Sequence, residues 1–177
     1  VGQGFFLLGH SFGSAVAMTI TADPRRTEVL GLGISGWGAR LTDDLVPDTV
    51  RAHWGALGLY PPGTFRSNAT LIGPVPPSER AEALGWSAAF AGVAAKIPVP
   101  VRCTFAEHEA LWRHDAVSAS ELSAAFTSAP IVVVDRQLAA GHNISLGYAA
   151  RSYHLRTLGF FDECLAWRTA SRRHRGR

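Results

Sequence analysis

The sequence predicts an α/β protein with a mostly parallel sheet and helices on both faces. Two observations carry this prediction: four short apolar runs have the composition of buried strands, and helical segments lie between and after them. Strands separated by helices usually pair in parallel, because each helix returns the chain to the same end of the sheet. No stretch reaches the roughly 20 apolar residues of a membrane helix, so no membrane span is expected.

The four predicted strands are continuous apolar runs, rich in β-branched or aromatic residues, with the length of strands buried on both faces: Phe5–Gly9, Val29–Ser35, Val99–Phe105 and Ile131–Asp135. Between the first two, a pattern of small and apolar residues predicts a helix of about three turns that ends before Pro24. These three elements form a strand-helix-strand unit.

Two further helices are expected in the second half of the chain. Ser78–Ala95 is rich in alanine and glycine, so this helix can pack closely against a sheet. The last helix is expected from about Ile144 to Ala166, with a predicted apolar stripe that comprises Leu146, Ala149, Tyr153, Leu158, Phe161 and Leu165.

Residues 37–78 differ from this alternating pattern. The segment has prolines at positions 47, 61, 62, 74, 76 and 77, several aromatic residues and only patchy periodicity, with one short helix expected over Val46–Leu57. Long irregular segments in compact domains are usually lids, binding loops or disordered regions, and the aromatic content argues against disorder. We therefore predict a core over residues 1–36 and 79–167, a cap or lid insertion over 37–78, and a basic tail over 168–177.

The charge distribution does not indicate nucleic-acid binding. The formal charge is +3, but five arginines lie in the last ten residues, which we interpret as an ordinary terminal tail. The two cysteines, Cys103 and Cys164, are interpreted as reduced, packed thiols of a cytoplasmic protein. Their spacing suits neither a disulfide framework nor a metal site.

The sequence Gly9-His10-Ser11-Phe12-Gly13 stands where the first predicted strand meets the first helix. A tight turn there lifts the Ser11 hydroxyl above the end of the strand, where a substrate can reach it. We expect a Cβ atom at Gly9 or Gly13 to clash. Amides at the start of a helix lack helical acceptors, so the Phe12 N–H is a candidate oxyanion donor. The alternative is a turn whose serine only caps the helix.

This motif and its setting resemble the nucleophile elbow of the α/β-hydrolase superfamily, in particular that of its serine esterases and lipases. The resemblance extends over nearly the whole chain and implies a partial α/β-hydrolase fold. Strands that precede the elbow in the family have no counterpart here, so we expect the chain to be the carboxyl-terminal part of a longer protein. The resemblance also implies a catalytic acid after the third predicted strand and a catalytic histidine after the fourth.

Both places hold suitable residues. After the third strand, the sequence AEHE is similar to the Gly-x-x-Asp turn of the family, with alanine in place of glycine and Glu109 in place of aspartate. Glu109 is therefore the expected acid, and Glu107 and Asp115 are its rivals. After the fourth strand, a Gly-His pair makes His142 the expected general base for Ser11.

The family resemblance also implies a cap with an apolar substrate pocket, for which the insertion and its start provide four aromatic residues: Trp37, Trp54, Tyr60 and Phe65. His10 is expected to pack under the nucleophile. His108 and His114 lack the i, i+4 spacing of a histidine pair that binds a metal on one helical face. We expect neither a metal nor a cofactor.

The sequence thus predicts a serine hydrolase that cleaves a carboxylic ester or thioester of a small or medium apolar substrate through an acyl-enzyme. The expected partner is this small-molecule substrate, and the sequence does not indicate an oligomeric state. Two alternatives stay open. A related α/β-hydrolase acyltransferase, haloperoxidase or lyase would use the same triad, whereas a catalytically inactive member would bind a ligand.

Overall fold

A computed structural model of the chain describes residues 4–42, 57–69 and 76–175. Within these residues, four parallel strands form a sheet in the order β1-β2-β3-β4: β1 (Phe5–His10), β2 (Val29–Ser35), β3 (Val101–His108) and β4 (Val132–Gly141). The predicted parallel sheet is confirmed. The last two strands continue past their predicted ends, so that they finish next to Glu109 and His142.

Central and outer strands of this sheet differ in burial. Every residue of β2 is buried, as are the first six residues of β3. In β1, by contrast, Phe5 and Leu8 are 42% and 45% exposed, and most of β4 is only partly buried. The prediction of burial on both faces is therefore correct for the two central strands and wrong for β1 and β4. These outer strands have one neighbouring strand each within the described sheet.

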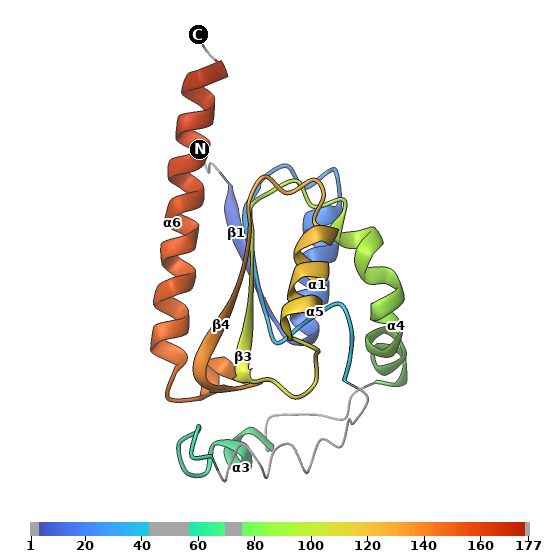
Figure 1. Cartoon of the computed structure of the whole chain (residues 1–177), viewed down its shortest axis with the longest axis vertical. Helices are drawn as coiled ribbons and strands as arrows, with labels where there is room; N and C mark the ends of the chain where they lie inside the picture. Colours follow the sequence, from blue (N-terminus) through green and yellow to red (C-terminus); the bar gives the residue numbers. More distant parts are fainter. Residues whose placement is uncertain (1–3, 43–56, 70–75, 176–177) are drawn as a thin grey trace.

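Helices cover both faces of the sheet, as predicted (Figure 1). The long helix α6 (Ala150–Arg175) lies along one face, and α1 (Phe12–Ala22) and α5 (Ala116–Ala125) lie on the other. Helix α4 (Pro77–Ala94) packs on α1. The short helix α3 (Thr64–Ala69) lies beyond the carboxyl ends of the strands.

Two helices differ from the sequence-based expectation. Helix α5 was not predicted, because its small polar residues form no apolar stripe. The expected last helix is divided into a 3-10 turn, Ile144–Leu146, and helix α6, which continues through Arg168 to Arg175. The described part of the basic tail is therefore helical.

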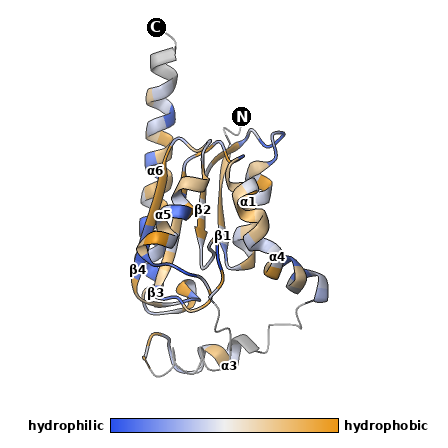
Figure 2. Ribbon diagram, turned by 45° about the vertical axis from the view of Figure 1, so that its right-hand side comes forward, coloured by the Kyte–Doolittle hydropathy of each residue, from blue (hydrophilic) through white to orange (hydrophobic). Residues whose placement is uncertain are grey.

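The main core lies between the sheet and the helices α1, α4 and α5. Its largest buried side chains come from all three helices, from β2 and β3 and from the loops next to them: Met18, Leu32, Ile34, Trp37, Trp86, Phe90, Ile97, Phe105, Trp112, Leu122 and Phe126. Figure 2 shows that apolar residues dominate the strands, while the helices carry polar residues as well. This packing holds the start of α1 firmly against the carboxyl end of the sheet.

The predicted stripe of α6 is only partly correct. Tyr153 is buried, but Leu158 and Leu165 are 62% and 45% exposed. The buried side of the helix instead comprises Tyr153, Thr157, Phe160 and Cys164, at helical spacing. The apolar pattern missed this register because one of its four positions is a threonine, whose hydroxyl is hydrogen-bonded inside the fold.

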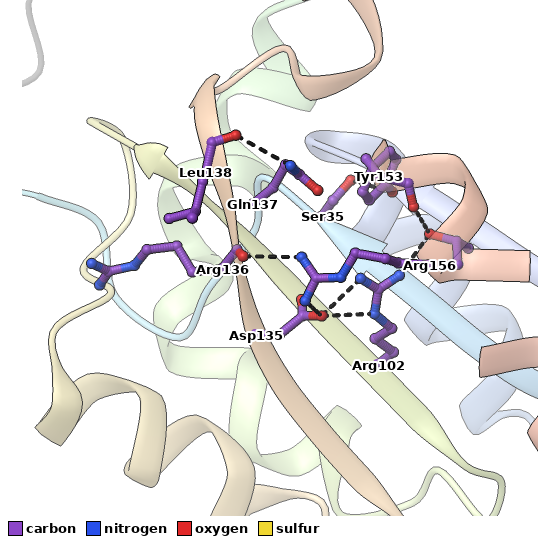
Figure 3. A network of polar contacts seen from close by, with 9 residues as sticks. Ser35, Arg102, Asp135, Arg136, Gln137, Leu138, Tyr153 and Arg156 are labelled. Carbon is purple, nitrogen blue, oxygen red and sulfur yellow. Dashed lines mark hydrogen bonds and ion pairs between the residues drawn. The ribbon is translucent and has the colours of Figure 1, made fainter. Parts of the chain in front are cut away.

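A polar network joins β3, β4 and α6 around a buried arginine (Figure 3). Arg102 donates to Asp135 Oδ2 from Nη2 at 2.7 Å and from Nε at 3.1 Å, and its Nη1 donates to Thr157 Oγ1 at 2.8 Å. Arg156 also donates to Asp135 Oδ2, at 2.7 Å. A charged residue is stable in this buried strand because its donors meet a carboxylate and a hydroxyl.

Removal of Arg102 should destabilise the fold more than removal of Arg156. The two side chains are 4% and 43% exposed, although both lie 2.7 Å from Asp135. Arg102→Leu should lower the free energy of unfolding by about 3 kcal/mol, because it breaks a buried ion pair. Arg156→Leu should cost less than about 1 kcal/mol, because water screens that pair. Urea unfolding measures both values, and equal losses would contradict the expectation.

Candidate active site

Ser11 lies between β1 and α1 in a backbone conformation that is rare for a residue with a side chain. Its φ is +51° and its ψ is −131°. Such strained geometry is typical of functional turns. The Ser11 side chain makes no capping hydrogen bond to α1, so the alternative of a simple helix cap does not hold. Its backbone amide donates to Ser35 O at 2.9 Å, which ties the turn to β2.

The two glycines of the elbow have different roles. A Cβ atom on Gly9 would lie 2.5 Å from Ser14 Cα and 2.6 Å from Gly13 O, so this position requires glycine. A Cβ atom on Gly13 would meet nothing within 4 Å. The expected clash is therefore confirmed for Gly9 and wrong for Gly13, whose Cβ would point into open space.

Strand register brings the other two candidates together. His108 of β3 pairs with Gly141 of β4. The next residues, Glu109 and His142, therefore leave adjacent parallel strands at the same edge of the sheet. Ser11 follows β1 at this edge as well, because parallel strands all end on the same side.

Three side chains form one hydrogen-bonded line at this edge. The Ser11 hydroxyl donates to His142 Nε2 at 3.0 Å, and His142 Nδ1 donates to the two Glu109 carboxylate oxygens at 3.0 and 3.1 Å. His142 and Glu109 are 5% and 6% exposed. The arrangement joins a hydroxyl, an imidazole and a carboxylate in the geometry of a serine triad.

The electrostatics favour an ionised Glu109. Burial raises the pKa of its carboxyl, but His142 and the hydrogen bond from the Leu111 amide lower it, and the net pKa lies below the ordinary value. A carboxylate accepts the Nδ1 proton of a neutral His142, which then presents the lone pair of Nε2 to the Ser11 hydroxyl.

The two rival carboxylates make other contacts. Glu107 Oε2 accepts from the Ala139 amide at 2.7 Å. Asp115 caps helix α5, where its Oδ1 accepts from the Val117 and Ser118 amides at 3.0 Å each. Both carboxylates therefore support local backbone structure.

His10 lies under the elbow, as expected. Its ring centroid is 5.2 Å from that of His142, and its Nδ1 lies 3.0 Å from Ser35 Oγ. Burial, followed by the neighbouring His142, lowers the pKa of His10 to about 4, although a hydrogen bond with Asn143 opposes this shift. His10 is therefore neutral near pH 7.

This depressed pKa should make the fold sensitive to acid. Folded His10 stays neutral down to about pH 4, whereas in the unfolded chain it takes up a proton near pH 6.5. The free energy of unfolding should therefore fall, by about 3 kcal/mol, as the pH is lowered across this interval. His10→Gln should flatten the dependence and the exposed-site control His154→Gln should retain it. Urea unfolding across the interval is the measurement, and an unchanged slope in His10→Gln would contradict the assignment.

The four aromatic candidates do not line one common pocket among the described residues. Trp37 lines an apolar pocket of about 180 Å³ together with Ser11, and the remaining walls are Leu41, Ala83, Leu84, Leu111 and Trp112. Tyr60 and Phe65 line a different pocket of about 430 Å³ with Tyr148. Trp54 and nearly all of the short helix expected over Val46–Leu57 lie outside the described residues.

The other His, Cys, Asp and Glu side chains among the described residues form no metal site. No three His, Cys, Asp or Glu side chains in this part of the chain gather in a way that could hold a metal ion, and none of its helices is long and apolar enough to cross a membrane. His114 Nδ1 contacts the Trp112 carbonyl at 3.0 Å. Both cysteines are free and buried, and burial raises the pKa of each thiol.

Solved structures share the fold of this chain but little of its sequence. A monoacylglycerol lipase from Paleococcus ferrophilus has a TM-score of 0.63 at 14% identity, over 92% of this chain and 70% of that protein. A soluble variant of monoglyceride lipase from Saccharomyces cerevisiae has a TM-score of 0.63 at 12% identity, over 91% and 62%. A thioesterase domain from the curacin biosynthetic pathway has a TM-score of 0.53 at 14% identity, over 88% and 66%.

No family model matches the sequence, and no curated protein matches it. At these identities the likeness shows the fold, which is the α/β-hydrolase fold that the elbow implied. The chain spans about two thirds of the length of these solved proteins.

Proposed function

We propose that this chain carries the catalytic centre of a serine hydrolase that cleaves carboxylic esters or thioesters. The observation that supports this most is the hydrogen-bonded line from Ser11 through His142 to Glu109. These residues come from three separate loops, and Ser11 and His142 are 131 positions apart in the sequence. A contact between such distant residues, at a strained serine, is typical of a catalytic site.

The proposed reaction has two steps. His142 Nε2 takes the hydroxyl proton while Ser11 Oγ bonds to the carbonyl carbon, and His142 then gives this proton to the departing alcohol or thiol. In the second step, a water molecule attacks the acyl carbon while His142 Nε2 takes its proton. His142 then returns the proton to Ser11 Oγ as the bond between this oxygen and the acyl carbon breaks and the acid is released. Glu109 orients the imidazole and stabilises its positive charge in both steps.

The start of α1 supplies one oxyanion donor in this proposal. Phe12 is the first residue of the helix, and the first amides of a helix have no acceptor within it. The Phe12 N–H directly follows the nucleophile and can therefore stabilise the negative oxygen of the tetrahedral intermediate.

In this proposal the two pockets bind the two parts of the substrate, the acyl group and the leaving group. The acyl group occupies the smaller pocket, which contains Ser11 and the buried, 4% exposed Trp37 among apolar walls. The leaving group lies on the side of Tyr60 and Phe65. This side is next to the loop of His142, because the Tyr148 amide donates to Leu59 O at 3.1 Å. The base that protonates the leaving group then lies beside it.

The smaller pocket should limit the length of the acyl chain. A cavity of about 150 Å³ holds benzene, so the pocket of about 180 Å³ suits an acyl group of roughly six carbons. We expect kcat/KM for p-nitrophenyl esters to be highest near butanoate and hexanoate and to fall by about tenfold or more at decanoate. A maximum at decanoate would contradict this assignment.

Variants of two similarly exposed leucines test whether this pocket sets the preferred acyl length. Leu84 of α4 is 61% exposed and lines the pocket, whereas Leu155 of α6 is 59% exposed and lies on the other face of the sheet. Leu84→Ala should raise the ratio of decanoate to hexanoate hydrolysis, and Leu84→Trp should lower it. Leu155→Ala should leave the ratio unchanged.

The proposed function is tested by covalent labelling of the full-length protein with a fluorophosphonate, followed by intact-mass analysis. One adduct on the parent that is absent from Ser11→Ala supports the nucleophile. A folded parent that stays unlabelled would instead favour a ligand-binding protein without hydrolase activity.

A further inference from the structure

A second polar line runs beneath the proposed triad. Tyr153 OH of α6 donates to Ser35 Oγ at the end of β2 at 2.9 Å, and Ser35 Oγ lies 3.0 Å from His10 Nδ1. On its other side, His10 Nε2 lies 3.5 Å from Asn143 Oδ1. Ser35 and Tyr153 are 0% and 1% exposed, and Figure 3 shows them beside each other.

The donors and acceptors give this line a direction. Tyr153 donates to Ser35, so the Ser35 hydroxyl can itself donate a hydrogen bond to His10 Nδ1 at 3.0 Å, a shorter contact than the 3.5 Å to the Gly9 carbonyl. His10 then carries its proton on Nε2, which faces the Asn143 side-chain oxygen. A neutral His10 therefore satisfies every bond from Tyr153 to Asn143.

This line ends beside the base of the proposed triad. Asn143 directly follows His142 in the chain, and the rings of His10 and His142 are 5.2 Å apart. Both rings pack against Gly36, where an added Cβ atom would lie 2.9 Å from His10 Cε1 and from His142 Cε1. The position of the His10 ring therefore restricts the position of the His142 ring.

We propose that His10 is a positioning residue, held by Ser35 and Tyr153, that keeps the His142 ring aligned with Ser11. This inference deepens the proposed function and rests on it. His10 would act through the neighbouring ring of His142, so its loss should lower the rate of acylation and leave substrate binding unchanged. A neutral ring beside His142 also avoids repulsion when His142 becomes an imidazolium.

The test compares two substitutions at His10 in the full-length protein. A glutamine can accept from Ser35 and donate to Asn143, whereas a leucine of similar size can do neither. We expect His10→Leu to lower kcat for p-nitrophenyl butanoate and the rate of fluorophosphonate labelling by about 30-fold, with KM unchanged. His10→Gln should stay within about threefold of the parent.

Variants further along the line separate positioning from folding. Ser35→Ala and Tyr153→Phe should each lower kcat by about tenfold, the value of one buried hydrogen bond. The control Ser128→Ala removes an exposed hydroxyl that donates to the Ala95 carbonyl and takes no part in this line, so it should have no effect. Melting temperatures identify any variant whose loss of rate reflects unfolding.

The outcomes distinguish the two proposals. A parent that reacts with the fluorophosphonate, together with a folded His10→Leu variant that reacts equally fast, overturns the positioning role alone. Equal losses of kcat in His10→Gln and His10→Leu overturn it too, because the hydrogen bonds would then be irrelevant. A folded parent that does not react overturns the proposed function and this inference with it.

Discussion

His142→Ala should lower kcat for ester hydrolysis by about 10⁵- to 10⁶-fold, the largest effect expected for a single substitution besides loss of the nucleophile. His142 Nε2 lies 3.0 Å from Ser11 Oγ, and without it nothing removes the hydroxyl proton as the oxygen attacks. The measurement is the steady-state rate with p-nitrophenyl butanoate, together with the rate of fluorophosphonate labelling.

The control for this prediction is His154→Ala. His154 is exposed on α6 and makes a ring contact with Tyr153 at 5.0 Å. Its removal should leave both rates close to those of the parent. A His142→Ala variant that retains a kcat within about tenfold of the parent would show that another group acts as the base.

Glu109→Gln should lower kcat by about 10³- to 10⁴-fold with little change in KM. Glutamine keeps the shape of the side chain but removes the negative charge, and its amide group can turn a donor toward His142 Nδ1. This contact then favours the tautomer with the proton on Nε2, which can no longer accept from Ser11. Steady-state kinetics on the folded variant provide the measurement.

Two rival carboxylates serve as matched controls for Glu109. Glu107→Gln and Asp115→Asn remove one charge each from the same region, yet these side chains accept from backbone amides of Ala139 and of helix α5. Both variants should retain nearly full kcat. A loss in Glu107→Gln as large as that in Glu109→Gln would contradict the choice of the acid.

Much of the fold could be predicted from local sequence patterns. Continuous apolar runs indicated the four strands, and the glycine-flanked serine between a strand and a helix indicated the elbow. The resemblance of this elbow to that of the α/β-hydrolase superfamily then implied Glu109 and His142 as the partners of Ser11. Their side chains lie in one hydrogen-bonded line, while their catalytic roles stay a proposal that labelling and kinetics will test.

Other features could not be predicted, because they depend on contacts between distant segments. The buried side of α6 includes the polar residue Thr157, whose hydroxyl accepts from Arg102 of β3 and donates to the Tyr153 carbonyl inside the fold. The polar line from Tyr153 to His10 was missed for the same reason: Tyr153 and the Ser35 hydroxyl to which it donates are 118 positions apart and carry no shared motif. The separation of Trp37 from Tyr60 into different pockets also arises from packing.

The sequence by itself determined the strands, the elbow and the set of carboxylates from which an acid could come, since these depend on residue type and spacing within one segment. Only the tertiary structure decided which carboxylate meets the histidine. The pairing of His108 with Gly141 places Glu109 next to His142, whereas the Ala139 amide and helix α5 hold Glu107 and Asp115. Register between two strands is a long-range property, which no local pattern encodes.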